Sequence, residues 1–352
     1  MPGSALTATG PLARLSPMRI LVIGGTHFMG PRLVRALLAR GHAVTTFHRG
    51  TTPCILPAEV ERLYGDRSDS AQLESALAAR SFDACVDTIA MRGAETAAAV
   101  ELLYGRVGHY VHFSTGQVYL VRRDCPAPAR EEDYAGPLGT PPDPHAWDAG
   151  QWTYGIEKRD CEDILEEAWT ARGFPATRLR LTMVHGAEDP RGRIHAYALR
   201  LLDGGPLLVP GEPSPPIRPI HADAVVETVV RVLEEGSGKG AAYNLAQDEA
   251  WTHEELIGGI AGMLSVEAAL ERRPREELVR AGVFPACAPL ANPWMSYLDP
   301  GLAARELGFR PGTFEDWLPG LVATAAARPA PEEFVEARAR ELALAKAPRA
   351  PA

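Results

Sequence analysis

The sequence predicts an α/β protein with a doubly wound parallel sheet, followed by a smaller C-terminal lobe. Short apolar segments typical of buried strands alternate with helical segments through the first half of the chain, an order typical of parallel sheets. A glycine-rich turn follows the first strand. From Gly186 onward the pattern changes to Pro- and Gly-rich pieces with short helices. At 352 residues the chain is long enough for two lobes.

The first strand–helix–strand unit extends from Met18 to Gly50. Residues 19–23 (RILVI) form an apolar run typical of a central parallel strand. Residues 31–40 place four apolar side chains on one helical face, Gly41 stands where a helix C′ glycine belongs, and residues 43–47 form the next strand. The turn between them contains Gly24, Gly25 and Gly30. Such a turn directs a helix N-terminus at an anion, normally a dinucleotide pyrophosphate, and so predicts a Rossmann-type domain.

Further elements follow in the same alternation. Strands are expected at residues 60–64, 84–89, 109–113 and 176–184, and helices at 70–79, 95–104 and 152–172, the last closed by Gly173. Residues 120–150 are rich in Pro, Gly, Asp and Ala and predict a long loop, which in a compact domain usually serves a function.

These elements suggest four segments. Residues 1–17 have no periodicity and predict a disordered extension, or an upstream start with Met18 as the functional one. Residues 18–185 form the nucleotide-binding domain, and residues 186–327 mainly the second lobe, with some segments returning to the first domain. Residues 328–352 are an Ala/Pro-rich tail with a short helix at 332–345 and a frayed end.

The composition narrows the class of partner. The net charge is −9 with both signs interspersed, which argues against a broad nucleic-acid or membrane surface. The five cysteines form no CxxC pair and suit a reducing cytoplasm. No apolar run approaches the length of a membrane span, and we expect no metal site.

The chemistry is carried by three groups in order along the chain. Tyr154 and Lys158 are four residues apart and share one helical face, where an ammonium lowers the pKa of a nearby phenol and makes it a usable acid or base. Ser114 and Thr115 end the strand before that helix and predict a hydroxyl facing Tyr154 across the cleft. Alone each pattern is common, but together with the glycine turn they predict hydride transfer at a carbinol or ketone.

The chain resembles the extended short-chain dehydrogenase/reductase family, whose members are largely NAD(P)-dependent epimerases, dehydratases and reductases of sugar nucleotides. The resemblance covers roughly residues 18–320. It rests on Gly24-Gly25-Thr26-x-Phe28-Met29-Gly30, Gly65-Asp66, Phe113-Ser114-Thr115-x-x-Val118-Tyr119, Tyr154-x-x-x-Lys158, Arg180 with Gly186, Ile220-His221-Ala222-Asp223, Ala242-Tyr243-Asn244-Leu245 and Leu307-Gly308-Phe309-x-Pro311. The long gap from Thr115 to Tyr154, with a non-glycine at His27, is similar to an atypical subgroup that includes plastid stem-loop RNA-binding proteins.

The resemblance implies a role for each matching residue. Tyr154 would be the proton donor and acceptor, Lys158 would hold the nicotinamide ribose, and Thr115, three residues before Val118, would orient the substrate hydroxyl. The substrate would also meet Met183 and Arg218. The NAD(P) cofactor would contact Gly24, Thr26, His27, Phe28, Met29, Gly30, His48, Arg49, Asp66, Arg67, Thr88, Ile89, Ala90, Ser114, Tyr154, Lys158 and Met183.

Four departures from the family pattern shape the prediction. His27 replaces a glycine, so its ring either points away or lies over the cofactor. Gly116 and Gln117 stand where 4,6-dehydratases carry an Asp-Glu pair, which argues against dehydration. His48-Arg49 replaces the acidic residue that takes the ribose 2′-hydroxyl; Arg49 pairs with a 2′-phosphate, which favours NADP, or only stacks on adenine. Arg218 lies one residue out of register and is either a phosphate ligand or a solvated loop charge.

Two groups of alternatives stay open. His185, Arg191, Arg193 and His195 either meet an anionic substrate or form a polar rim. The activity is either epimerisation of a sugar, which the family resemblance implies is nucleotide-linked, or NADPH-dependent ketone reduction. The alternative of another class is a non-catalytic nucleotide- or RNA-binding protein. The resemblance also implies a homodimer formed through residues 152–172.

Overall fold

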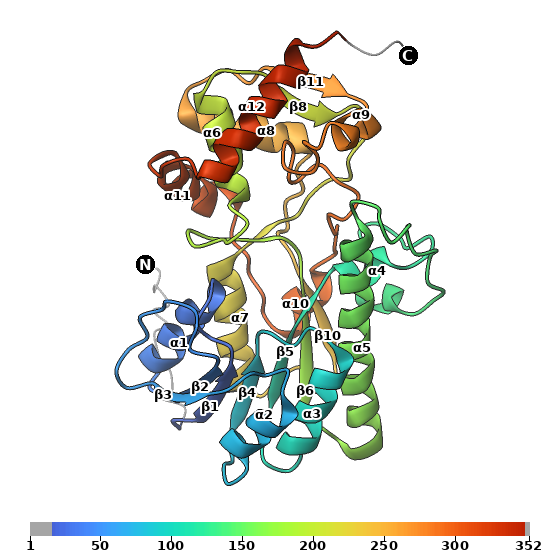
Figure 1. Cartoon of the computed structure of the whole chain (residues 1–352). Coiled ribbons are helices and arrows are strands. Elements are labelled where there is room, and N and C mark those ends of the chain that lie inside the picture. Colours follow the sequence, from blue (N-terminus) through green and yellow to red (C-terminus); the bar gives the residue numbers. More distant parts are fainter. Residues whose placement is uncertain (1–15, 349–352) are drawn as a thin grey trace, which may run out of the picture.

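The computed structural model describes residues 16–348. A parallel sheet with helices on both faces forms the larger domain, and a smaller lobe lies beyond the carboxyl ends of its strands (Figure 1). The predicted fold class is therefore confirmed. The disordered extension expected at residues 1–17 lies almost entirely outside the described residues.

The central sheet has seven strands in the order β10-β6-β5-β4-β1-β2-β3, and every neighbouring pair is parallel. The chain order reverses between β1 and β4, and in such sheets ligands bind at this point, outside the carboxyl ends of the strands. The strands are β1 (Arg19–Ile23), β2 (Ala43–His48), β3 (Glu61–Tyr64), β4 (Ala84–Asp87), β5 (Tyr110–Thr115), β6 (Ala176–Leu181) and β10 (Ala242–Leu245).

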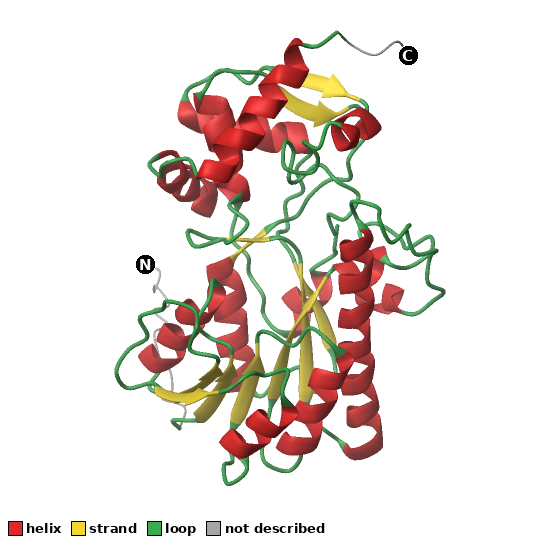
Figure 2. Cartoon of the chain, in the orientation of Figure 1, coloured by secondary structure: helices red, strands yellow, loops and turns green. Residues whose placement is uncertain are grey.

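Helices cover both faces of this sheet (Figure 2). On one face, apolar residues of α1 (Met29–Ala39) and α7 (Ala222–Glu235) pack against the strands, as in Leu33 against Val22. On the other, α2 (Ser70–Leu77), α3 (Gly93–Leu103) and α5 (Ala149–Arg172) form a second core with Leu21 and Ile23. Because both faces are buried, β1 is apolar at every position after Arg19.

The smaller lobe has a core of its own. It contains α6 (Arg193–Leu202), β8 (Leu207–Pro210), α8 (His253–Leu264), β11 (Leu270–Arg273), α9 (Arg275–Arg280), α11 (Phe314–Ala326) and α12 (Glu332–Lys346), and β8 pairs with β11. Between the two bodies, β7 (Val184–His185) pairs with β9 (Ile220–His221). Helices α7 and α10 (Gly301–Glu306) and strand β10 return to the large domain.

Three segments differ from the expectations. Residues 120–150 are mainly loop, but α4 (Gln117–Leu120) leads into them and a 3-10 turn, η1 (Glu131–Tyr134), lies within them. The strand expected at 176–184 ends at Leu181, because Thr182 turns its hydroxyl to the carbonyl of Arg218 and the chain then pairs with β9. The short helix expected at residues 332–345 is confirmed as α12, but its residues Arg338 and Glu341 are buried against the lobe, which was not expected of a tail. Among residues 16–348, no helix combines the length and apolar character needed to cross a membrane.

Candidate active site at the carboxyl edge of the sheet

The glycine turn after β1 packs closely enough that side chains are excluded from it. Gly24 has φ of 99°, and a Cβ atom there would lie 2.4 Å from Oγ1 of Thr88. A Cβ atom on Gly30 would lie 2.5 Å from the carbonyl carbon of Gly25. These contacts bring the N-terminus of α1, whose helix dipole favours an anion, directly against the end of β1.

A cleft of about 790 Å³ opens over this turn. Its lining includes these residues expected at the cofactor: Gly24, Thr26, His27, Phe28, Met29, Gly30, His48, Arg49, Asp66, Arg67, Thr88 and Ile89. His27 is exposed on the rim, so its ring does not obstruct the approach to the turn. The position at the sheet's reversal point and the glycine-supported helix end both fit a dinucleotide.

The far end of this cleft carries polar groups from the ends of β2 and β3. Nδ1 of His48 accepts a hydrogen bond from the Gly50 N–H at 3.1 Å, and burial lowers the pKa of His48. Nε2 of His48 is buried without a partner among the described residues. Asp66 accepts from the Ser68 N–H at 2.9 Å and from its hydroxyl, and these bonds lower its pKa. Arg49 is exposed beside them.

Arg67 was expected to contact the cofactor, but its charge is directed away from this cleft. Its side chain is 5% exposed, and its guanidinium pairs with Asp87 on β4 and donates to the Glu95 carbonyl at 2.6 Å. Tyr110 donates to the same Asp87 carboxylate at 2.7 Å. The buried carboxylate needs a cation, and Arg67 supplies it, so only the edge of Arg67 faces the cleft.

A second cleft of about 840 Å³ adjoins the first, and Phe28 and Met91 line both. Thr115, Tyr154 and Met183 line this second cleft. Burial raises the pKa of Tyr154, and the neighbouring Thr115 hydroxyl partly offsets that effect. The predicted pair of hydroxyls therefore lies in the second cleft, which shares Phe28 and Met91 with the first.

Lys158 lies outside both clefts. Its ammonium donates to the carbonyls of Ala90 at 2.8 Å and Phe113 at 2.6 Å, and it contacts Nε2 of His112 at 3.0 Å. The lysine is 2% exposed, and burial lowers its pKa. Burial raises the pKa of Tyr154, while the ammonium of Lys158 is held by Ala90, Phe113 and His112.

Three other expected ligands also point away from the clefts. Ser114 is buried and donates to Glu162 of α5, which in turn pairs with Arg180 of β6. Ala90 is 1% exposed and uses its carbonyl on Lys158. Arg218 donates to the Leu298 carbonyl at 3.0 Å and lies over the ring of Tyr297. Each is held by a partner distant in sequence.

The second cleft also contains residues that the sequence did not single out as ligands. Gln117 lies beside Thr115 and hydrogen-bonds to Gln151. The aromatic side chains of Trp147 and Trp294 line the cleft from the 120–150 loop and from the segment before α10. Only the fold brings these two tryptophans to the cleft, because no local sequence pattern marks either of them.

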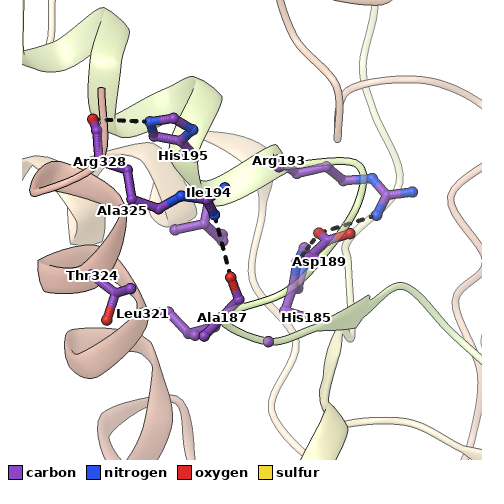
Figure 3. Close-up of a pocket in the computed structure, with 12 residues that line it drawn as sticks. His185, Ala187, Asp189, Arg193, Ile194, His195, Leu321, Thr324, Ala325 and Arg328 are labelled. Carbon is purple, nitrogen blue, oxygen red and sulfur yellow. Dashed lines mark hydrogen bonds and ion pairs between the residues drawn. The ribbon is translucent and has the colours of Figure 1, made fainter. Parts of the chain in front are cut away.

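The basic cluster noted after β6 divides between the cleft and the lobe. Arg191 and Arg193 line the second cleft. Figure 3 shows Asp189 between His185 and Arg193, at 3.5 Å and 3.6 Å respectively. His195 instead faces the Arg328 carbonyl at 3.4 Å, away from Asp189. Arg191 and Arg193 therefore line the cleft, as the first of the two alternatives expects, whereas His195 does not.

Residues 20–246 match the model of the NAD dependent epimerase/dehydratase family. The chain belongs to this family. The resemblance drawn from the motifs is confirmed, and the match includes the glycine turn, Thr115, Tyr154 and Lys158.

Two curated relatives of this family member are named for different functions. The chloroplast stem-loop binding protein of 41 kDa b from Arabidopsis thaliana is 27% identical over 259 residues, covering 70% of this chain. The 2′-dehydrokanamycin reductase of Streptomyces kanamyceticus is 26% identical over 248 residues, covering 68% of this chain. The chain spans 63% and 64% of the lengths of these two relatives.

Solved structures of epimerases and dehydratases share the fold. The UDP-glucose 4-epimerase of Thermotoga maritima with UDP-glucose has a TM-score of 0.68 at 19% identity, covering 92% of this chain and 100% of that one. The dTDP-glucose 4,6-dehydratase of Bacillus anthracis in complex with NAD has a TM-score of 0.68 at 19% identity, covering 90% and 98%. At these identities the likeness shows the fold alone.

Proposed function

We propose that this family member is an NAD(P)-dependent epimerase-type oxidoreductase that acts on a sugar, specifically a nucleotide sugar, through a keto intermediate. The observation that carries the proposal is the adjacency of the two clefts. Thr115 and Tyr154 line the second cleft, and Phe28 and Met91 line both clefts. A carbinol placed there would lie within reach of both hydroxyls and of a nicotinamide ring.

In this proposal Thr115 orients the substrate hydroxyl and Tyr154 removes its proton, then returns the proton to the keto oxygen. A bound NAD(P) would accept hydride from the carbinol carbon and return it to either face of the ketone. For Lys158 to hold the nicotinamide ribose, as the family resemblance implies, it would have to release one of its three hydrogen bonds.

The cleft's lining supports a substrate with an anionic group. Arg191 and Arg193 line the cleft together with Asp189, whose carboxylate lies 3.6 Å from Arg193. The aromatic faces of Trp147 and Trp294 provide surfaces on which a sugar or base ring can stack. A nucleotide sugar has a diphosphate and two ring systems, which suits this lining.

Dehydration of the 4,6-dehydratase type is disfavoured at this site. A Cβ atom on Gly116 would lie 2.4 Å from Oγ of Ser296, so an acidic side chain has no room there. Gln117 occupies the next position and bonds to Gln151. Neither residue can supply the acid and base that water loss needs.

The first experiment is to denature the freshly purified protein and to identify any released nucleotide by chromatography. An epimerase-type cycle predicts retained NAD⁺ or NADP⁺, because the cofactor is regenerated within each turnover. Protein that binds neither nucleotide, as purified or on titration, would refute the proposal.

The matched variants are Tyr154→Phe and Thr115→Val. With a panel of nucleotide sugars, loss of the Tyr154 acid/base should reduce turnover by about 10²- to 10⁴-fold. Cofactor binding by titration should stay near the wild-type value, because both residues line the other cleft. Unchanged turnover in Tyr154→Phe would remove the catalytic assignment.

A ketoreductase is the second candidate, favoured by the similarity to 2′-dehydrokanamycin reductase. It predicts a protein that arrives empty, binds NADPH reversibly, and consumes it with a keto substrate. The similarity to a stem-loop binding protein favours a third candidate, RNA binding. That candidate predicts RNA affinity with a steep salt dependence, which the net charge of −9 opposes.

We further propose a preference for NADP over NAD, supported by Arg49 and by the unpartnered Nε2 of His48 at the end of the cofactor cleft. A charge-assisted bond from Arg49 to a 2′-phosphate predicts that Arg49→Ser weakens NADPH binding about tenfold. NADH binding should change little. Equal effects on both, measured by fluorescence titration, would show that Arg49 only stacks on adenine.

The family resemblance also leads us to propose a homodimer formed through α5 and its neighbour α3, which pack against each other on one face of the sheet. Light scattering of the purified protein would test this, and a monomer would contradict it.

A further inference from the structure

The aspartate at the start of α5 does not cap its own helix. Asp148 is the N-cap residue of α5, and its carboxylate accepts no hydrogen bond from the first backbone N–H groups of that helix. An aspartate at this position normally does so. At the start of α2, for example, Oδ1 of Asp69 accepts from the N–H groups of Ala71 at 3.0 Å and Gln72 at 3.2 Å. The carboxylate of Asp148 is therefore available for a different partner.

That partner is a tryptophan of the segment before α10. Oδ2 of Asp148 accepts a hydrogen bond from Nε1 of Trp294 at 3.0 Å, across 146 positions of the chain. Trp294 is 8% exposed, and an indole has only this one N–H donor. Since a buried donor without an acceptor is costly, the bond favours one orientation of the indole, with its N–H directed at the start of α5.

The backbone of Trp294 is fixed separately, by its own segment. Its N–H donates to Oδ1 of Asn292 at 2.9 Å, and Nδ2 of Asn292 donates to the Pro289 carbonyl at 3.3 Å. Trp147, the residue before the N-cap, packs edge to face against Phe284 of the lobe core, with ring centroids 4.8 Å apart. The start of α5 and the lobe segment are thus joined by two neighbouring contacts, one polar and one aromatic.

This junction lies beside the proposed acid and base. Trp147, Trp294 and Tyr154 all line the second cleft, and Tyr154 lies in the second turn of α5, the helix that begins after Asp148. Because successive turns of a helix keep a fixed spacing, the separation between the indole of Trp294 and the phenol of Tyr154 depends on the bond to Asp148. A ring that stacks on the indole would be held at a set distance from the phenol.

We propose that Trp294 is a stacking residue of the second cleft and that Asp148 is its positioning residue. The ligand group is a flat ring with an apolar face, which the sugar and the base of a nucleotide sugar both have, and the indole receives that face. The inference rests on the proposed function, in which Tyr154 acts on a carbinol of the same substrate. Asp148 then sets the place of the ring relative to Tyr154, and such alignment is what proton and hydride transfer require.

The first part of the test is the indole signal of Trp294 in the full chain without ligand. Protein labelled with ¹⁵N at its six tryptophans gives six indole N–H signals, and Trp294→Phe assigns the one of interest. Asp148→Ser keeps a good N-cap residue but is too short to reach the indole, so it should shift this signal and speed its hydrogen exchange. Asp148→Asn keeps an acceptor oxygen and should leave the signal near its wild-type position. The matched control, Asp69→Ser at the N-cap of α2, should not move it.

The second part is ligand binding, measured by calorimetry and by the same indole signal. The probes are UDP-glucose and dTDP-glucose, with UDP and dTDP as probes that lack the sugar. A nucleotide sugar that binds should move the Trp294 signal, and it should bind roughly tenfold more weakly to Trp294→Leu, on the scale of a lost stacking contact. Asp148→Ser should weaken binding in the same direction, and Asp148→Asn should restore most of the affinity. A signal that the diphosphates alone move identifies the stacked ring as the base, and one that only the nucleotide sugars move identifies it as the sugar.

A nucleotide sugar that binds without moving the Trp294 signal would overturn the stacking assignment. Wild-type affinity in Asp148→Ser, or an indole signal that this variant leaves in place, would overturn the role of Asp148. Should Trp294→Leu not fold, the Asp148 variants decide, because Asp148 is only half-buried. Failure of the proposed function is seen differently, as no binding of any of the four probes by the wild-type protein, and the stacking assignment would then fall with it.

Discussion

At the residue scale, the glycine turn of the cofactor cleft requires that residue 30 has no Cβ atom. Gly30 has ordinary helical backbone angles, yet a Cβ atom there would meet three backbone atoms of Gly25 at 2.5, 2.6 and 2.9 Å. Backbone atoms cannot rotate away as a flexible side chain can. The start of α1 would have to move off the end of β1, and the positive end of the helix dipole would move with it.

Gly30→Ala is therefore expected to destabilise the protein by about 1–3 kcal/mol, the usual range for overpacking, and to weaken NAD(P) binding. The matched control is Gly258→Ala in α8, where a Cβ atom meets nothing within 4 Å. Replacing this helical glycine with alanine should raise the free energy of unfolding by about 0.5–1 kcal/mol. Thermal unfolding with and without nucleotide would measure both, and equal effects at the two glycines would contradict the packing argument.

At the element scale, a buried ionic cluster joins β5, β6 and α5 below the site. Glu162 of α5 is 0% exposed and accepts two hydrogen bonds from Nε of Arg180, at 3.1 and 3.0 Å, one from its Nη2 at 2.6 Å, and one from Ser114. Burial acts to raise the pKa of Glu162, but the charges of Arg180 and Arg178 and the hydrogen bonds from Arg180 and Ser114 together outweigh it, and the pKa is lowered. The cluster sets the orientation of the helix that carries Tyr154.

The lowered pKa predicts how this cluster depends on pH. A carboxyl whose pKa is lower in the folded than in the unfolded protein stabilises the fold above its unfolded pKa of about 4.3, and this contribution is lost as the pH falls through the folded value. Glu162→Gln should cost about 3–5 kcal/mol near neutral pH, since it leaves Arg180 buried without its partner.

Urea unfolding of the wild type and Glu162→Gln across pH 3 to 7 would test this. The difference in unfolding free energy should be largest at pH 7 and should narrow below about pH 4.3. A difference that stays constant, or widens in acid, would show that Glu162 is not ionised in the folded protein.

At the scale of the whole molecule, the C-terminal helix is part of the smaller lobe. Glu341 of α12 is 0% exposed and pairs with Arg200 of α6 at 2.9 and 2.5 Å. Arg338 of α12 adds bonds to Asp203 at 2.7 and 2.8 Å. Helix α6 follows directly after the loop that contains Arg191, one of the residues lining the second cleft. Helix α12 therefore supports the lobe behind that cleft.

Glu341→Gln is expected to destabilise the protein by about 3–5 kcal/mol, because it leaves the buried charge of Arg200 with weaker pairing. The control is Glu227→Gln, whose partner Arg40 is exposed; such surface pairs contribute about 0–1 kcal/mol. Chemical denaturation monitored by circular dichroism would compare them. A small effect at Glu341 would show that α12 is not anchored by this pair.

The sequence by itself determined the fold class, the glycine turn, and the order of Thr115, Tyr154 and Lys158, because these depend on local periodicity and on the spacing of a few residues. Tertiary structure alone decided where the neighbouring polar groups point. Ser114, Arg67, Lys158 and Arg218 turn away from the clefts toward Glu162, Asp87, His112 and Leu298, from 20 to 80 positions along the chain. A buried polar group must find a partner wherever the fold provides one, and no local pattern in the sequence records which partner that is.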